Sequence, residues 1–379
     1  MSSVPPADPG PAAGPSDAPA QRPPGGEEGR GWLGALGERA QRGAFRLERR
    51  VTALLSALAR RRGWTPAVHS YAGYAAAGRV RVLARVLLVA PGVVPNEVTG
   101  VAGWRRLLTL EQPGVPIDVT LRSQDSDDPS RHRLVSGTGG LVDATVTHDV
   151  RPGRAQALLR VGDRPPVAEV VHAALDGGLG VVCDIDDTAW VTGLRHPLRA
   201  AWRTFARGST GREAVPGMAD LLRAAVAGQE HPAVVYLSNG PWNLAGPVAR
   251  FLERHGFPPG PLLMTEWGFR PDAWFRSGRE HKAGALRRLL EELPRTRWLL
   301  VGDDGEHDPV LYGDLAREHP DRVAAVAVRQ VVPDRDAAAV ARRVAGVPVV
   351  TGPDGRALLT ALDAVLGPRP WAVGDADPA

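Results

Sequence analysis

The chain has 379 residues, of which 43% are hydrophobic, and this composition allows two folded domains with ordinary cores. The net charge of +4 fits an anionic surface or substrate but does not require nucleic acid. Cys183 is the single cysteine, which excludes an internal disulfide. No apolar run approaches the roughly 20 residues of a membrane span, and residues 1–30 contain no apolar secretion signal. We therefore expect a cytoplasmic protein.

The two ends and the segment after the first end are predicted from composition and periodicity. Residues 1–30 and 368–379 are rich in Pro, Gly and Ala, so we expect disordered tails. Residues 31–64 are predicted to form a basic amphipathic helix, because Leu33, Ala40, Leu47 and Leu54 recur every seven positions among many arginines. Such a helix could lie at the inner face of a membrane, or dock on its own protein with its arginines in water.

Residues 65–172 are predicted to be a β-rich domain. Apolar and polar residues alternate there in short runs that turn-forming clusters separate. The runs are Val80–Leu88, Ile117–Leu121, Val142–Val146 and Ala155–Val161. This pattern is typical of a small antiparallel β-sandwich-like domain, but it does not tell what the domain binds.

Residues 173–367 are predicted to form an α/β domain with a doubly wound parallel sheet. Fully apolar strands are expected at 179–183, 233–237, 298–301, 323–328 and 347–350. Helical stretches lie between them, at 219–227, 244–255 and 282–293. Alternation of strands and helices favours parallel βαβ units, and the short intervals around the second strand leave room for only a small cap.

Polar clusters follow three of these strands. Asp184 and Asp186 follow the first strand, Ser238 follows the second, and Asp303 follows the third. Lys282 begins a predicted helix between the second and third. Because parallel strands end at one edge of a sheet, these side chains should converge.

Crowded carboxylates need a cation, and oxygen ligands of this kind suit Mg²⁺. We therefore expect a metal-assisted phosphoryl-transfer site. Asp184 would attack phosphorus, and Asp186 would protonate the leaving alkoxide and later deprotonate water. Lys282 would balance charge on the phosphate and on Asp184, and Ser238 would hold phosphoryl oxygens.

The remaining site residues are assigned by position. Thr188 would fix the turn after the first strand. The amides of Asn239 and Gly240 would bind phosphoryl oxygens, and Trp242 follows them in the same loop. Mg²⁺ would bind Asp184, the Asp186 carbonyl and Asp303, while Asp308 would bind it directly or orient its waters.

The order Asp184/Asp186/Thr188, Ser238, Lys282, Asp303/Asp308 resembles the four motifs of haloacid dehalogenase (HAD) phosphatases. The blocks Asp184–Thr188, Ser238–Asn243, His281–Lys282 and Gly302–Asp308 further resemble the actin-patch-protein type of phosphatidate phosphatase, most densely over 179–330. Bacterial members of that family are similar in placing a β-rich segment first. The resemblance implies a HAD-like fold and Mg²⁺-dependent conversion of phosphatidate to diacylglycerol. For such a lipid, apolar side chains near the first two motifs could hold acyl chains, or could instead pack the cap and core: Trp190, Leu194, Leu198, Trp202, Phe205 and, best placed because it follows the phosphate loop, Trp242.

Two positions depart from the family pattern, and two other functions stay open. Asp304 stands where Ser is expected, which adds negative charge near the metal, and Val310 stands where an acidic residue is common. A HAD phosphatase of a soluble phosphomonoester or phosphoprotein would carry the same motifs. A non-enzymatic lipid- or protein-binding adaptor is the third reading, against which the retained acidic residues and Lys282 argue. No obligate protein partner is evident in the sequence.

Overall fold

The computed structural model describes residues 50–93, 110–123, 129–191, 213–265, 271–305, 307–331 and 342–367, together with 369 and 371. Apart from residue 50, they all belong to one compact unit, Val51–Ala379. The predicted tail 1–30, the first part of the helix predicted over 31–64, and most of 368–379 lie outside the described residues. Among the described residues, no helix has the length and apolar character that crossing a membrane would need.

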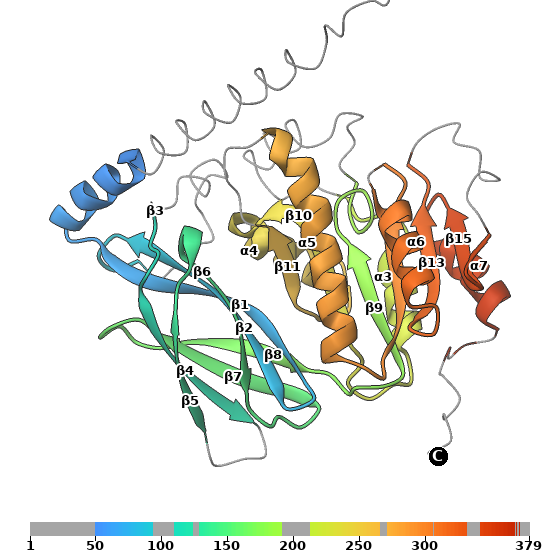
Figure 1. Cartoon of the computed structure of the whole chain (residues 1–379), viewed down its shortest axis with the longest axis horizontal. Helices are drawn as coiled ribbons and strands as arrows, with labels where there is room; N and C mark the ends of the chain where they lie inside the picture. The colour runs from blue at the N-terminus through green and yellow to red at the C-terminus, as the bar shows by residue number, and fades with distance from the viewer. Residues whose placement is uncertain are drawn as a thin grey trace, which may run out of the picture. The chain divides into compact units, whose positions relative to one another are not determined.

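A helix over residues 50–61 opens the described chain and leads into a first sheet of eight strands (Figure 1). Its strands are β1 (Thr65–Ala76), β2 (Arg79–Val89), β3 (Leu110–Glu111), β4 (Pro116–Ser123), β5 (Ser130–Val135), β6 (Leu141–Thr147), β7 (Gly153–Arg160) and β8 (Val167–Ala173). The order is β3-β2-β1-β8-β7-β4-β5, and β6 also pairs with β2. Every pairing is antiparallel except β1 with β8.

This first sheet has its own apolar core. Alternate side chains of β2, among them Val82 and Val86, are buried in one cluster with Ile117 of β4 and Leu159 of β7. The predicted strands of the β-rich segment correspond to β2, β4, β6 and β7, whereas β1, β3, β5 and β8 were not predicted. The segment is therefore β-rich and mostly antiparallel, as expected, with one parallel pair in addition.

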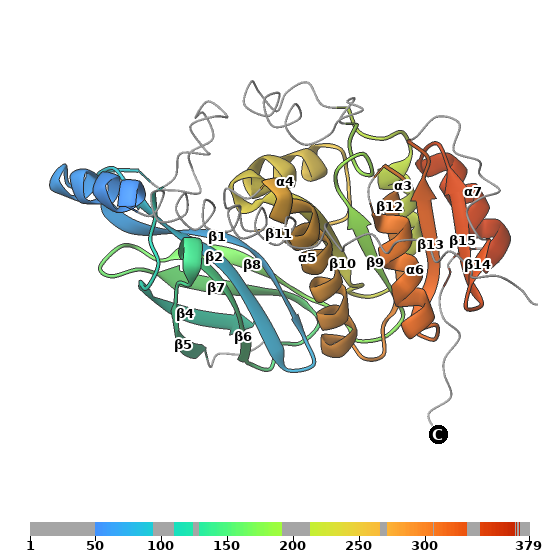
Figure 2. The same ribbon diagram turned by 45° about the horizontal axis from the view of Figure 1, so that its top comes forward.

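The second sheet has seven strands in the order β11-β10-β9-β12-β13-β15-β14 (Figure 2). Their bounds are β9 (Leu179–Asp184), β10 (Val234–Pro241), β11 (Leu262–Thr265), β12 (Arg297–Asp303), β13 (Val323–Arg329), β14 (Arg343–Val344) and β15 (Val347–Gly352). All neighbours are parallel except β14 and β15. All five predicted strands are present, and β11 and β14 are added at the two edges.

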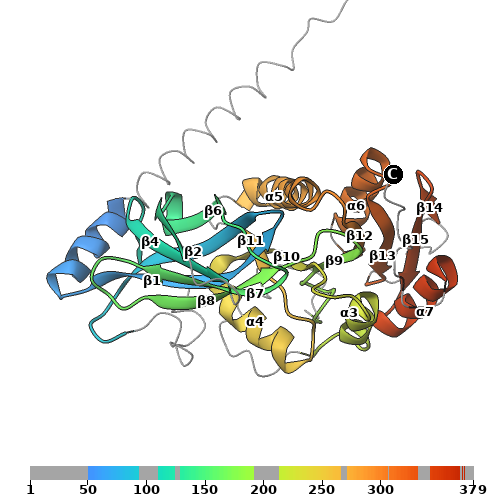
Figure 3. The same ribbon diagram turned by 90° about the horizontal axis from the view of Figure 1, so that it is seen from below.

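Helices cover both faces of this parallel sheet (Figure 3). They are α3 (Met218–Val226), α4 (Ala245–Arg254), α5 (Pro271–Glu292), α6 (Asp308–Glu318) and α7 (Gly355–Leu366). α5 and α6 lie on one face, and α3, α4 and α7 lie on the other. Burial on both faces explains why β9 is apolar along nearly its whole length. The prediction that a helix begins at Lys282 was wrong, because α5 begins at Pro271 and Lys282 lies in its middle.

The two sheets also share apolar contacts. Tyr71 and Tyr74 of β1 and Leu83 of β2 belong to the same buried cluster as the core of the parallel sheet. β2 is therefore buried on both sides, with Val82 in the core of the first sheet and Leu83 toward the α/β segment. The strand ends of β9, β10 and β12 lie next to one another, and this edge carries the predicted site.

Candidate active site

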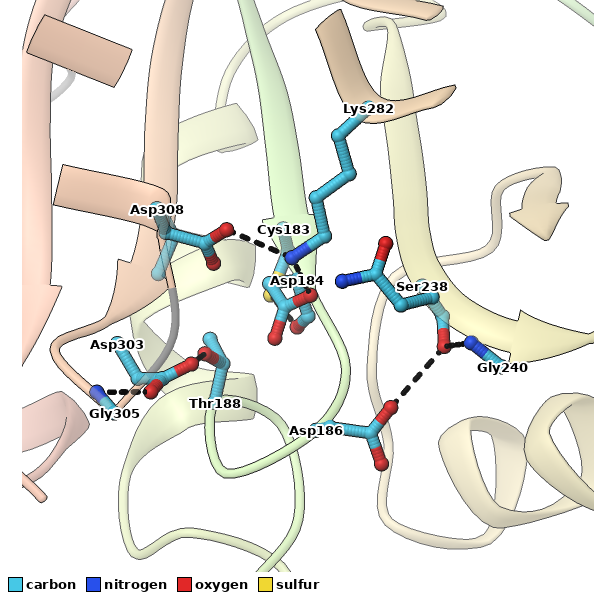
Figure 4. A network of polar contacts seen from close by, with 12 residues as sticks. Cys183, Asp184, Asp186, Thr188, Ser238, Gly240, Lys282, Asp303, Gly305 and Asp308 are labelled. Atoms are coloured by element: carbon cyan, nitrogen blue, oxygen red, sulfur yellow. Dashed lines mark hydrogen bonds and ion pairs between the residues drawn. The ribbon is translucent and has the colours of Figure 1, made fainter. Parts of the chain in front are cut away.

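A tight turn after β9 separates the first two carboxylates of the site. Asp184 is the last residue of β9, and the amide of Ala189 then donates to the carbonyl of Ile185 at 3.0 Å. Asp187 has φ of 53°, a left-handed conformation that Asp tolerates better than most residues. The turn directs Asp184 and Asp186 to different partners, as Figure 4 shows.

Lys282 joins two of the predicted site residues. Its Nζ donates to Asp184 Oδ1 at 2.6 Å and to Asp308 Oδ1 at 2.7 Å (Figure 4). The side chains of Lys282, Asp184 and Asp308 are only 2%, 1% and 1% exposed. α5 thus delivers a buried cation to the end of β9, as the sequence predicted in spite of the misplaced helix start.

Asp303 completes a cluster of three buried carboxylates. One carboxylate oxygen each from Asp184, Asp303 and Asp308 lies within 4.8 Å of the others. Asp303 Oδ1 accepts from the Gly305 amide at 2.6 Å, and Oδ2 accepts from Thr188 Oγ1 at 3.4 Å. Thr188 therefore ties the turn after β9 to the end of β12, which goes beyond the local role predicted for it.

This donor set fits a divalent cation. Three buried carboxylates meet one ammonium group, so the cluster has an excess of negative charge that is costly without a further cation. Asp308 Oδ2 is buried, and within the described part of the chain it has no hydrogen-bond partner. A Cβ at residue 302 would lie 2.6 Å from this oxygen, so Gly302 provides the space that it occupies. Oxygen ligands from carboxylates are those that Mg²⁺ and similar hard ions prefer.

Asp186 belongs to a second group of contacts around Ser238. Ser238 Oγ donates to Asp186 Oδ2 at 3.2 Å and accepts from the Gly240 amide at 2.9 Å. Trp190 Nε1 donates to Asp186 Oδ1 at 3.2 Å. Asp186 is therefore held by side chains on both of its oxygens, and sequence reasoning did not assign Trp190 to it. The predicted metal contact of Asp186 was through its carbonyl, and none of the observed contacts tests it.

Two other predicted substrate contacts take different positions. Asn239 is half-buried and faces α5, where a Cβ at Gly278 would lie 2.9 Å from Asn239 Oδ1. The ring of Trp242 is 3% exposed and lies 4.6 Å from the ring of Tyr71, centroid to centroid. Trp242 therefore packs between the two sheets, and its contact with a substrate stays a prediction. The other apolar candidates near the first motif, at 194, 198, 202 and 205, lie outside the described residues.

Asp304, which departs from the family pattern, has a structural contact. Its Oδ1 accepts from the amide of Val331 at 2.7 Å, which holds the segment after β13. Arg329, at the end of β13, donates from Nη1 to the carbonyl of Asp187 at 2.6 Å. Arg329 was not singled out in the sequence, since a lone arginine at a strand end gives no signal of its own.

Burial removes one competing nucleophile. The pKa of the Cys183 thiol is raised well above its usual value by burial, and the neighbouring carboxylates of Asp184 and Asp308 raise it further. The thiolate is the reactive form of cysteine, so Cys183 stays an inert core residue. Cys183 therefore does not compete with Asp184, which is the nucleophile that the sequence predicts at the end of β9.

Comparison with known proteins agrees with this arrangement. Residues 179–330 match the family described as the catalytic domain of phosphatidate phosphatase APP1. Phosphatidate phosphatase APP1 of Saccharomyces cerevisiae is 25% identical over 231 residues, which cover 59% of this chain and 39% of that protein. An uncharacterized protein of Schizosaccharomyces pombe is 23% identical over 158 residues, covering 41% of this chain and 26% of that protein. The predicted family resemblance is thus confirmed.

These matches extend over part of each relative. The chain spans less than half of the length of both curated relatives. A carbohydrate acetylesterase from Xanthomonas citri aligns over 79% of this chain and 75% of its own length, with a TM-score of 0.27 and 10% identity.

Proposed function

We propose, from the match of residues 179–330 to the catalytic-domain family of phosphatidate phosphatase APP1, that the chain is a Mg²⁺-dependent phosphatase that hydrolyses phosphatidate to diacylglycerol and phosphate. The observation that carries this proposal is the convergence of Asp184, Lys282, Asp303 and Asp308 at one edge of the parallel sheet. The order of these residues and the cover of helices on both sheet faces support a HAD-like, doubly wound domain.

In the first step, a carboxylate oxygen of Asp184 attacks phosphorus, and the bond between phosphorus and the ester oxygen breaks. The leaving alkoxide takes a proton from Asp186, whose position Ser238 and Trp190 support by hydrogen bonds. The product of this step is an aspartyl-phosphate and a free alcohol, which is diacylglycerol for a phosphatidate substrate.

In the second step, Asp186 takes a proton from water as the water oxygen attacks the aspartyl-phosphate, and the bond from phosphorus to Asp184 breaks. Lys282 offsets negative charge on Asp184, while Ser238 and the Asn239 amide hold the phosphoryl oxygens. The Gly240 amide donates to Ser238 Oγ in the structure and would exchange this partner for a phosphoryl oxygen when substrate binds. Asp184, the Asp186 carbonyl, Asp303 and Asp308 would hold the Mg²⁺, which supplies charge neutralisation for the phosphoryl group.

We also propose that the protein acts in the cytoplasm at the inner face of a membrane, through the helix that includes residues 50–61. Val51, Leu54, Leu55 and Leu58 are exposed on this helix, between 42% and 62% each. Arg60, Arg61 and Arg62 follow at its end. Exposed aliphatic side chains beside arginines favour an anionic lipid surface, and phosphatidate is itself anionic.

A soluble phosphomonoester or a phosphoprotein is the second candidate substrate. The observation that favours it is the burial of Trp242 against Tyr71, because this ring was the best placed of the predicted acyl contacts. The chemistry at Asp184 and Asp186 would be the same for either substrate.

The test is phosphate release by the full chain from dispersed phosphatidate, from a soluble sugar phosphate and from a phosphopeptide. We expect fastest release from phosphatidate, loss of release in EDTA, recovery with Mg²⁺, and no release by Asp184→Asn. Asp304→Asn is the matched control, since it changes a neighbouring buried carboxylate that holds the Val331 amide. Equal or faster turnover of the soluble substrates would favour the second candidate, and full activity of Asp184→Asn would refute the covalent mechanism.

A further inference from the structure

Two arginines of β2 point away from the core of their own sheet. Val80, Val82, Ala84 and Val86 of β2 face that core, while the alternate residues Arg81, Leu83 and Arg85 do not. Arg81 and Arg85 are nevertheless only 5% and 1% exposed, because the α/β segment covers this face. A buried guanidinium is costly unless its donors are bonded, so its partners indicate what it does.

The partners of Arg85 include the chain segment that follows the predicted phosphate-binding loop. Its Nη1 donates to Oδ1 of Asn243. Its Nε donates to the carbonyl of Gly139 at 2.8 Å, and Nη2 pairs with Glu111 Oε1 at 2.6 Å. Arg85 thus connects β2, β3 and the turn at Gly139 to Asn243. Asn243 lies in the short 3₁₀ turn Trp242–Leu244 between β10 and α4.

A second contact holds the same turn from the same sheet. The Tyr71 ring packs on Trp242 with 4.6 Å between ring centroids. The pairing register of β1 with β2 shifts between Tyr71 and Tyr74, so both tyrosines reach the α/β core although they are three residues apart. Only glycine fits at residue 73 within this bulge, since a Cβ there would lie 2.3 Å from the carbonyl oxygen of Arg81.

The turn held in this way continues directly from Ser238, Asn239 and Gly240. On its other side, Thr265 Oγ1 of β11 donates to the Asn239 carbonyl at 2.8 Å. The loop is therefore fixed by β11 at its start and by β1 and β2 at its end. Amides that bind phosphoryl oxygens must be held in place before the substrate arrives, and this arrangement does so.

We propose that Arg85 is a positioning residue for the phosphate-binding loop, acting through Asn243, and that the β-rich sheet is thereby a component of the catalytic centre. This inference rests on the proposed phosphatase function. It assigns the β-rich segment a role in the reaction that does not require the segment to bind a ligand of its own. On the same face, Tyr74 OH donates to Glu292 of α5, and Arg81 binds both oxygens of Asp143 of the neighbouring strand β6 at 2.6 and 2.7 Å.

The experiment compares the full-length variants Arg85→Met, Asn243→Ala and the double variant. Val86→Ala is the matched control, because Val86 is the next residue of β2 and is buried in the other core, away from the loop. The readouts are kcat and KM for a soluble aryl phosphate, the Kd of inorganic phosphate with Mg²⁺ by calorimetry, and hydrogen exchange of the peptide 238–246.

For Arg85→Met we expect about a tenfold rise in KM and in the phosphate Kd, since small misplacements of binding groups cost this much or more. The double variant should be no worse than Asn243→Ala, because Arg85 acts through Asn243. Peptide 238–246 should exchange faster in Arg85→Met but not in Val86→Ala. Arg85→Lys, which keeps the charge and loses the fork of donors, should restore only part of the binding.

Two results would overturn the proposal: a Kd and KM for Arg85→Met equal to those of Val86→Ala, or effects of Arg85→Met and Asn243→Ala that multiply fully in the double variant. If the wild-type chain releases no phosphate from any substrate, the proposed function fails but hydrogen exchange still decides this point. Faster hydrogen exchange of peptide 238–246 in Arg85→Met, but not in Val86→Ala, then supports the positioning role. Equal exchange of this peptide in Arg85→Met and Val86→Ala refutes it.

Discussion

Lys282→Met tests the electrostatic account of the site most directly. The variant keeps the length of the side chain and removes the ammonium group that lies 2.6 Å from Asp184 and 2.7 Å from Asp308. All three side chains are almost completely buried, so two carboxylates lose their cation without gaining access to water. Removing one partner of a buried ion pair costs about 3–5 kcal/mol, and with two carboxylates affected we expect the upper part of this range, about 5 kcal/mol.

The assay is urea unfolding followed by tryptophan fluorescence, once in EDTA and once in excess Mg²⁺. The loss of unfolding free energy should be largest in EDTA. The loss should be smaller in Mg²⁺, because the divalent ion neutralises the carboxylates of Asp184 and Asp308, which in the variant have no ammonium group beside them. Phosphate release by the variant should be abolished in both conditions.

Arg279→Met is the matched control for this prediction. Arg279 lies one turn earlier on α5 and pairs with Asp314 at 3.3 Å, but the two side chains are 49% and 42% exposed. Exposed pairs contribute about 0–1 kcal/mol, so this variant should unfold nearly as the wild type does. If Lys282→Met also loses less than about 1 kcal/mol in EDTA, the buried pair does not have the energetic role inferred from its geometry.

Three further predictions concern the metal, the membrane and pH. Asp308→Asn should weaken the stabilisation by Mg²⁺ in a thermal-shift titration, whereas Asp314→Asn on the exposed side of α6 should not; equal titration curves would remove Asp308 from the metal site. Leu54→Glu with Leu58→Glu should reduce binding to vesicles containing phosphatidate at least about tenfold in a flotation assay, and unchanged binding would exclude this face as the lipid contact. Burial lowers the pKa of His172 from 6.5 to about 4, so the unfolded chain binds one more proton between these values and the protein loses stability as pH falls through this window. His172→Gln should remove up to about 1.4 kcal/mol per pH unit of that slope in urea unfolding, and an unaltered slope would contradict the assignment.

Much of the parallel sheet was predictable because its strands are buried on both faces. Such strands are continuous apolar runs in the sequence, and β9, β10, β12, β13 and β15 all follow that pattern. β11 was missed because four residues after a proline-rich stretch carry no measurable period. The start of α5 was missed although Pro271 is a common first helical residue, since Gly278 interrupts the helical pattern.

The convergence of site residues followed from a topological rule, whereas their individual contacts did not. Asp184 and Asp303 meet because the ends of parallel strands share one edge, which sequence order alone predicts. Lys282 instead reaches Asp184 from the middle of α5. That Thr188 binds Asp303, and that Trp190 binds Asp186, depends on a turn whose geometry is set by Asp187 at positive φ. Such a conformation has no reliable signature in a single sequence.

The two faces of β2 explain why the role of the β-rich segment could not be read from the chain. Alternation of apolar and polar residues normally places the polar side in water, so the pattern makes Arg81 and Arg85 look like surface residues. Their burial depends on a second layer that is more than a hundred residues away in sequence, where Asn243 accepts from Arg85. Local patterning contains no information about such a partner.

The β-rich segment and the α/β segment share part of one hydrophobic core. A boundary between residues 172 and 173 separates a β-rich pattern from an alternating βα pattern. The β-rich segment has a core of its own, but some of its residues also belong to the core of the α/β segment. Tyr71, Tyr74 and Leu83 lie in the same buried cluster as Trp242, which borders the proposed phosphate-binding loop. Segments that share buried apolar surface and buried hydrogen bonds, such as those of Tyr74 with Glu292 and Arg85 with Asn243, unfold together more readily than apart. We therefore expect the β-rich sheet and the α/β sheet to unfold together, and we expect the proposed phosphate-binding loop to be held by both.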